Sequence, residues 1–117
     1  MTMGEWYEAL NTRLNADGIK VKFNQPQAKD TLPLVHVNVH TDSDASTKFD
    51  TLNQVEQQID IYCEGTMAPF DFENYVQKVK WSISKVKRWN SLTTQTSIDD
   101  SIGRDLRRAM LLITVTI

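Results

Sequence analysis

Two histidines on one predicted strand are the residues of this chain best placed to do chemistry. His36 and His40 are four residues apart in an alternating segment, so we expect both on the face opposite the valines. Such a pair can bind zinc where carboxylates join it, and Asp42 and Asp44 follow closely. The alternative interpretation is a solvated polar strand face that runs into a polar loop. The sequence has no HExxH or CxxC pattern, and we predict no metal site.

Other chemical patterns are weaker still. The segment from Asp42 to Asp44 resembles the start of a calcium loop but lacks the glycine and the distal glutamate that an EF-hand needs. Cys63 alternates with predicted core residues, which is typical of a small buried hydrophobic side chain rather than a nucleophile. No glycine-rich loop that could cradle a phosphate occurs among only four glycines. We therefore predict no catalytic residue, no cofactor and no enzymatic activity.

The second predicted helix carries a basic outer face with a tryptophan in it. Trp81 lies opposite the apolar stripe of this helix, so we expect it to be exposed or half-exposed. An exposed tryptophan among cations suits a protein contact or stacking on a nucleobase, which makes a small nucleic-acid-binding module the alternative function. A solvated face with Trp81 covered by a loop or by lysine stems is the other interpretation. The basic residues are Lys78, Lys80, Lys85, Lys87 and Arg88.

Charge is distributed unevenly along the chain. The segment 40–66 has a balance of −5, and the segment 76–90 has a balance of +5. Subunits with one acidic and one basic region can associate head-to-tail and close into a ring, although both regions also suit ordinary soluble faces. The charged residues of the first segment are Asp42, Asp44, Lys48, Asp50, Glu56, Asp60 and Glu64.

Size and composition indicate a single globular domain over residues 1–117. The sequence is 40% hydrophobic and 24% charged, with a net charge of −2, so no global field favours nucleic acid or an anionic membrane. One cysteine excludes an internal disulfide and suits a reducing compartment. We expect no secretory signal, and no apolar run is long enough to cross a bilayer.

The pattern in the first half of the chain predicts a helix followed by two strands. Thr2 and Glu5 have capping-box spacing, which predicts a helix over residues 3–16 with its apolar residues on one face. Alternation predicts strands over 19–23 and 35–39, separated by a polar loop. We expect an exposed, mobile loop over 41–51.

The second half reads as strand, helix, strand, strand. Alternation predicts a strand over 52–64, and Pro69 with Asp71 as a possible N-cap begins a helix that reaches Asn90. Further strands are predicted over 92–98 and 106–117, with a turn at 99–105. The final strand is apolar on both faces, so it must lie centrally or under a second layer, either the first helix or a neighbouring subunit.

These elements give an α+β fold in the order α-β-β-β-α-β-β. Short connections favour a mainly antiparallel sheet of four to five strands, with two helices packed on one face. The signs of assembly outweigh those of catalysis.

In this order of elements the chain resembles the small tail-completion proteins of long-tailed bacteriophages and prophages, also called tail terminators or tail-to-head joining proteins. The resemblance covers nearly the whole chain and rests on the proline segment ending in Pro33-Leu34-Val35-His36-Val37, the strand 52–62, the following helix, and the closing strand 107–115.

The resemblance implies a structural virion protein that caps the head-proximal end of the tail tube as a homo-oligomeric ring, commonly of six subunits. It implies contacts with a tail-tube protein and a head-connector protein, and a place in the virion after assembly in the host cytoplasm. DNA would pass without specific binding, because Asp42, Asp44 and Asp50 in the loop 41–51 would repel phosphate. The basic second helix departs from this pattern.

Overall fold

The computed structural model describes residues 1–44, 52–101 and 103–117 of the chain. It confirms the α+β fold and the predicted order of two helices and five strands. These are α1 (Met3–Ala16), β1 (Val21–Lys22), β2 (Leu34–Asp44), β3 (Asn53–Glu64), α2 (Pro69–Ser84), β4 (Ser91–Asp99) and β5 (Leu106–Thr116).

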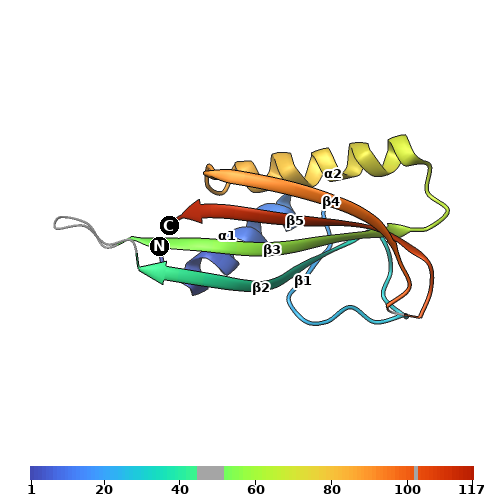
Figure 1. The fold of residues 1–117 in the computed structure, drawn as a ribbon, viewed down its shortest axis with the longest axis horizontal. Coiled ribbons are helices and arrows are strands. Elements are labelled where there is room, and N and C mark those ends of the chain that lie inside the picture. The colour runs from blue at the N-terminus through green and yellow to red at the C-terminus, as the bar shows by residue number, and fades with distance from the viewer. Residues whose placement is uncertain (45–51, 102) are drawn as a thin grey trace.

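The strands form one sheet in the order β1-β2-β3-β5-β4. Every neighbouring pair is antiparallel except β1 and β2, which are parallel. Both helices lie behind this sheet in Figure 1, and both contribute to one core with β3 and β5. The predicted central place of the last strand is confirmed, because β5 lies between β3 and β4.

The core fills the space between the helices and one face of the sheet. Trp6, Leu10 and Leu14 of α1 are fully buried, as their spacing of four predicts. The inward residues of β3 and β5 alternate with outward ones, so each strand presents one apolar row to the helices. The buried stripe of α2 is Phe72, Val76, Val79 and Ile83.

Local caps fix the ends of α1. The Thr2 hydroxyl accepts a hydrogen bond from the Glu5 amide, and the Glu5 carboxylate accepts one from the Thr2 amide, both at 3.1 Å. This is the predicted capping box. After the helix, Gly18 has φ +75°, a left-handed conformation that suits glycine.

The second helix is shorter than predicted at its end and begins differently. Its N-cap is Ala68 rather than Asp71, which lies in the first turn. The helix ends at Ser84 and not at Asn90, because the Asn90 amide already donates to the Thr114 carbonyl at the start of the β4–β5 ladder. The chain must therefore leave the helix before that point.

The first two strands also differ from their predicted lengths. Regular pairing of β1 is confined to Val21 and Lys22, which lie beside Val35 and His36. β2 is longer than predicted, because residues 41–44 continue the strand and pair with 53–56 of β3. The prediction of a loop over 41–51 is thus wrong for 41–44, and 45–51 lie outside the described residues.

Candidate assembly surfaces

A β-bulge in β2 separates the two histidines. Val37 pairs with Ile59 of β3, whereas His40 pairs with Gln57, so an extra residue enters β2 between them. An extra residue moves all later side chains to the opposite face. His36 therefore lies on the face away from the helices and His40 on the helix side. The predicted common face for the two histidines is wrong, so the two rings do not share the face that a zinc pair would need.

Gln57 fixes the bulge from the neighbouring strand. Its side chain is fully buried, and its Oε1 accepts a hydrogen bond from Trp6 Nε1 at 3.2 Å. Its Nε2 lies within donor distance of the carbonyls of Asn38 at 2.9 Å and Val39 at 3.2 Å. The bulge carbonyls thus find donors inside the sheet, which lets the backbone deviate without leaving buried groups unpaired.

The bulge creates an open groove along the outer edge of β2. Val39 points outward and is 67% exposed, although alternation placed it with the buried valines. The Tyr7 hydroxyl of α1 lies 2.7 Å from His40 Nδ1, and Phe23 packs edge-on against Tyr7. The groove has a volume of about 700 Å³ and runs between α1 and β2. Glu8 and Asn11 of α1 complete its wall.

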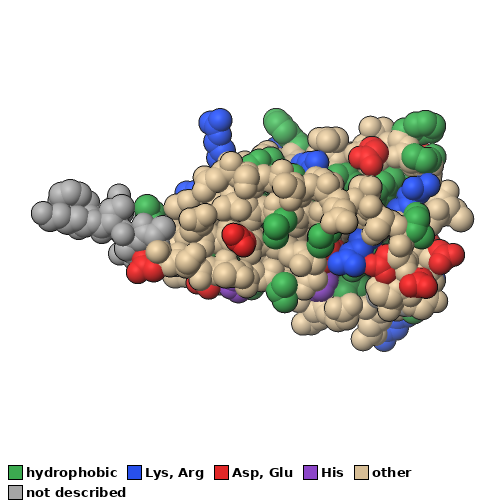
Figure 2. Space-filling view, in the orientation of Figure 1, with side chains coloured by type: hydrophobic (Ala, Val, Ile, Leu, Met, Phe, Trp, Pro, Cys, Tyr) green, Lys and Arg blue, Asp and Glu red, His purple; other side chains and the backbone are tan. Residues whose placement is uncertain are grey.

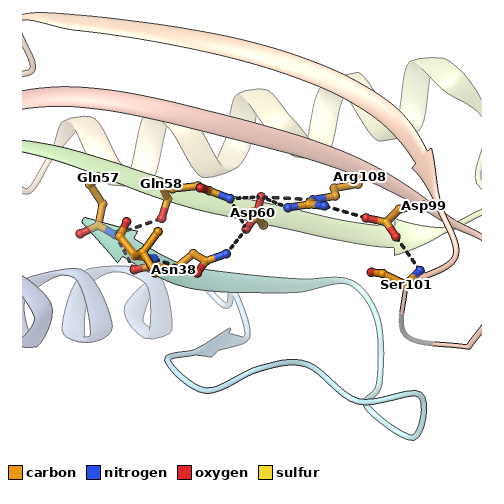
Figure 3. Close-up of polar contacts among 8 residues, drawn as sticks. Asn38, Gln57, Gln58, Asp60, Asp99, Ser101 and Arg108 are labelled. Carbon is orange, nitrogen blue, oxygen red and sulfur yellow. Dashed lines mark hydrogen bonds and ion pairs between the residues drawn. The ribbon is translucent and has the colours of Figure 1, made fainter. Parts of the chain in front are cut away.

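The opposite face of the sheet buries a charged network (Figure 3). Asp60 of β3 is fully buried and accepts from Arg108 of β5 at 3.0 Å and from Asn38 of β2 at 2.8 Å. Arg108 also donates to Asp99 of β4 at 2.7 Å, so the network ties four strands together. The Ser101 amide donates to the other oxygen of Asp99 at 2.6 Å.

This network changes the predicted acidic region. Asp60 is engaged inside the fold. Glu64 lies 3.6 Å from Arg104 at the end of β3 opposite to the residues that pair with Asp42 and Asp44, so Asp60 and Glu64 do not share a face with the acids of β2. His36 lies in the same layer, opposite Asp60 in the β2–β3 ladder, and is almost completely buried. Burial lowers the pKa of His36, and the charge of Asp60 opposes that shift.

Two further acids of the predicted region lie at the far end of β2. Asp42 is 46% exposed and lies 3.8 Å from His40, and Asp44 ends the strand. Both lie on the helix side, since the bulge reverses the face here. The other two predicted lumen residues, Lys48 and Asp50, lie outside the described residues.

Trp81 is exposed, as predicted, with 66% of its surface accessible. Lys85 lies 5.3 Å from the Trp81 ring centre and 3.7 Å from Asp17 of α1, so it is held within the chain. Of the predicted basic face only Lys78 and Lys80 belong to α2. The others follow the helix end, so the predicted face is divided between a helix and the segment leading into β4. These later residues are Lys85, Lys87 and Arg88.

Among the described residues, the face of the sheet away from the helices is covered at one end only. There Tyr62 and Leu106 are buried beside Leu32 of the 24–33 segment. The other end is largely uncharged and polar, and Figure 2 shows it as a mainly tan surface with scattered apolar side chains. β4 closes the sheet on this side, and its residues 93–98 are all exposed. Sequence reasoning missed this edge, although its lack of charged residues was a visible signal.

Cys63 is fully buried, and burial raises the pKa of its thiol to about 11. A thiol with such a pKa is a poor nucleophile at neutral pH. Within the described residues, no helix has the length and apolar character needed to cross a bilayer.

Comparison with known proteins finds a shared fold. A chain in the virion of a native gene transfer agent particle superposes with a TM-score of 0.54 and 16% sequence identity, over 95% of this chain and 90% of that one. No protein-family model and no curated protein matches the sequence. The similarity establishes the fold over nearly the whole length of both chains.

Proposed function

We propose that this chain is a structural protein of a phage-like virion that caps the head-proximal end of a tail tube and joins tail to head. The observation that carries the proposal is the fold shared with a gene transfer agent virion chain over 95% of this sequence. Two pairs of titratable side chains also support a non-enzymatic role, because each pair makes a structural contact within the fold. These pairs are Asp60 with Arg108 and Tyr7 with His40.

In this proposal identical subunits form a ring, with six as the working number. Its two sides contact a tail-tube protein and a head-connector protein. Asp42 and Asp44, at the end of β2, face the lumen and repel the phosphates of passing DNA. The protein resides at the head–tail joint of the virion and is assembled in the host cytoplasm.

Deletion of the gene from the replicon that encodes it tests the role. Electron microscopy of the resulting particles should show filled heads separated from tails, with tails of irregular length. Restoring the gene in trans should restore joined particles of uniform length. Normal particles from the deletion strain would overturn the proposal.

A second candidate function is nucleic-acid binding, favoured by the exposure of Trp81 beside Lys78 and Lys80. It predicts affinity for single-stranded DNA that falls steeply with salt and falls further in Trp81→Ala. The ring proposal predicts little DNA affinity at any salt concentration. Fluorescence anisotropy with a labelled oligonucleotide separates the two functions, and Lys29→Ala is the control for loss of a distant charge.

A further inference from the structure

The sheet has two open edges, and they differ in character. β4 forms one edge, and among the residues that the structure describes it pairs with β5 alone. On the other side β1 covers β2 only at Val35 and His36, and the backbone of the bulge is engaged by the side chains of Asn38 and Gln57. Past the bulge, the stretch from His40 to Ser43 has no strand on its outer edge among the described residues. An unpaired edge offers a row of backbone donors and acceptors to another strand.

The β4 edge lacks the usual protection against pairing. Residues 91–98 contain no charge, no proline and no glycine, and three of the eight are threonines, which favour strands. Natural sheets protect free edges with lysines, prolines or bulges. β4 pairs with β5 in an unbroken register, whereas β2 carries its bulge between Val37 and His40, so the part of β2 open to a partner is the stretch after the bulge. Ile98 near the end of β4 is 64% exposed, and Phe70 at the start of α2 is 74% exposed. This flank of the subunit thus combines an open strand with protruding apolar side chains.

From these observations we infer that the edge of β4 pairs with the outer edge of β2 in a second copy of this chain. The inference builds on the proposed ring and names its subunit interface. β2, β3, β5 and β4 are successively antiparallel, so β4 and β2 run in opposite directions. A copy that continues the sheet without inverting its faces therefore adds β4 to β2 as an antiparallel neighbour.

The groove beside β2 supports this pairing. Continuation of the sheet places the helix-side residues of β4 on the side where the groove of about 700 Å³ opens. Ile98 is one of these residues, because it pairs with Arg107 opposite Cys63. Val39 and Phe23 supply exposed apolar surface on the receiving side. The copy must also be displaced along the strands to clear β1, a stagger that closed sheets require.

Charge favours β4 on β2 over β4 on β4. Antiparallel pairing sets the start of β4 beside the end of β2, where Asp42 lies half-exposed. The basic segment with Lys87 and Arg88 leads directly into that start, so opposite charges meet. In this arrangement Asp42 lies at the rim where the subunit interface meets the proposed lumen. If β4 paired with β4 of a second copy about a two-fold axis, the groove beside β2 would stay empty. The basic segment with Lys87 and Arg88 would then not meet Asp42.

Cysteine cross-linking tests the interface in the full-length chain. Thr41→Cys on β2 and Gln95→Cys on β4 are exposed positions on the same face of the sheet. With a short bis-maleimide the doubly substituted chain should form a ladder of covalent multimers, and each single variant should stay monomeric on a denaturing gel. The Cys63 thiol is buried and stays unlabelled. Lys29→Cys combined with Gln95→Cys is the control that should give no ladder.

Two further sets of variants test whether the cross-linked ladder depends on the edge of β4. Thr94→Lys with Thr96→Lys should abolish at least nine-tenths of the ladder, whereas Thr12→Lys with Asn15→Lys on α1 should leave it unchanged. Asp42→Arg and Arg88→Glu should each weaken the ladder, and the double exchange should restore it. Circular dichroism confirms that each variant is folded.

The outcomes separate this interface from the ring itself. Dimers from Gln95→Cys alone would overturn the inference in favour of β4 pairing with itself. A ladder that persists in the variant with Thr94→Lys and Thr96→Lys would also overturn the inference. So would the absence of a ladder from the doubly substituted chain, whether light scattering shows oligomers or only monomers. None of these cross-linking outcomes changes the result expected for the deletion strain, which is heads separated from tails. The proposed function is therefore tested independently of the proposed interface.

Discussion

Adjacent leucines of β5 show how differently the two faces of the sheet are built. Leu111 is fully buried under the helices, whereas Leu112 on the opposite face is 45% exposed. The helix-covered face is held by apolar packing along the strands. The other face is held by charge and loop contacts at one end and is open at the other. Apolar packing is thus concentrated on one face, and within the described residues the edges and the open face are available to the proposed assembly.

Separate truncation of the two leucines should give the largest difference in stability between the two faces. Leu111→Ala should lower the free energy of unfolding by about 2–5 kcal/mol, because it leaves a cavity in a packed core. Leu112→Ala should change it by less than about 0.5 kcal/mol, the usual range for surface positions. Urea denaturation of both variants measures the difference. Equal losses would show that the open face is covered in the isolated chain.

The charged end of the open face should respond to the loss of Asp60. Asp60→Ala should lower the free energy of unfolding by about 3 kcal/mol, because it leaves the Arg108 side chain without this partner in a buried network. Asp99→Ala is the matched control, since Arg108 keeps its contact with Asp60, and it should cost less. Thermal denaturation of the two variants gives the order. A smaller loss for Asp60→Ala than for Asp99→Ala would contradict the central place of Asp60.

Sequence reasoning succeeded where the signal is local. The Thr2–Glu5 capping box and the spacing of the apolar residues of α1 lie within one segment, and the structure confirms them. The alternation in β3 and β5 likewise depends on neighbours in the chain. The order of elements follows from such patterns, which is why the fold class is predictable from residues alone.

Sequence reasoning missed the bulge and the charged network because the residues that form them are distant in sequence. Val37 and Val39 alternate regularly, and the bulge between them depends on Gln57 of another strand. Asp60 and Arg108 are 48 residues apart, and no local pattern pairs them. A polar glutamine in an apolar row was the one available signal, because a buried amide needs partners.

The bulge itself can be weakened through Gln57. Gln57→Ala should cost about 1–3 kcal/mol, because the carbonyls of Asn38 and Val39 and the Trp6 indole lose their partner in a buried place. Hydrogen exchange should also accelerate around residues 38–40. Gln58→Ala, on the other face, is the control and should have a smaller effect. Unchanged exchange in β2 would show that the bulge does not depend on Gln57.

The smallest predicted effect is a loss of stability at acid pH through protonation of His36. His36 lies in the buried charged layer, and its Nδ1 has no hydrogen-bond partner within the described residues. Burial lowers its pKa below the usual value of about 6.5, so the unfolded chain binds the proton more readily. Stability should therefore be full above that pH and decline as the pH falls through the interval below it.

The decline should be at most about 1.4 kcal/mol per unit of pH, the limit for one proton. The decline due to His36 is separable from the effect of a carboxylate such as Asp17. The Arg13 guanidinium and the Ser82 hydroxyl lower the pKa of Asp17 to about 2, so the contribution of Asp17 to stability is lost only in more acidic solution. Urea denaturation between neutral pH and about pH 5 should show the slope in the natural chain and not in His36→Gln. An identical slope in both would assign the protonation to another group, and the charged layer would then tolerate His36 as a cation.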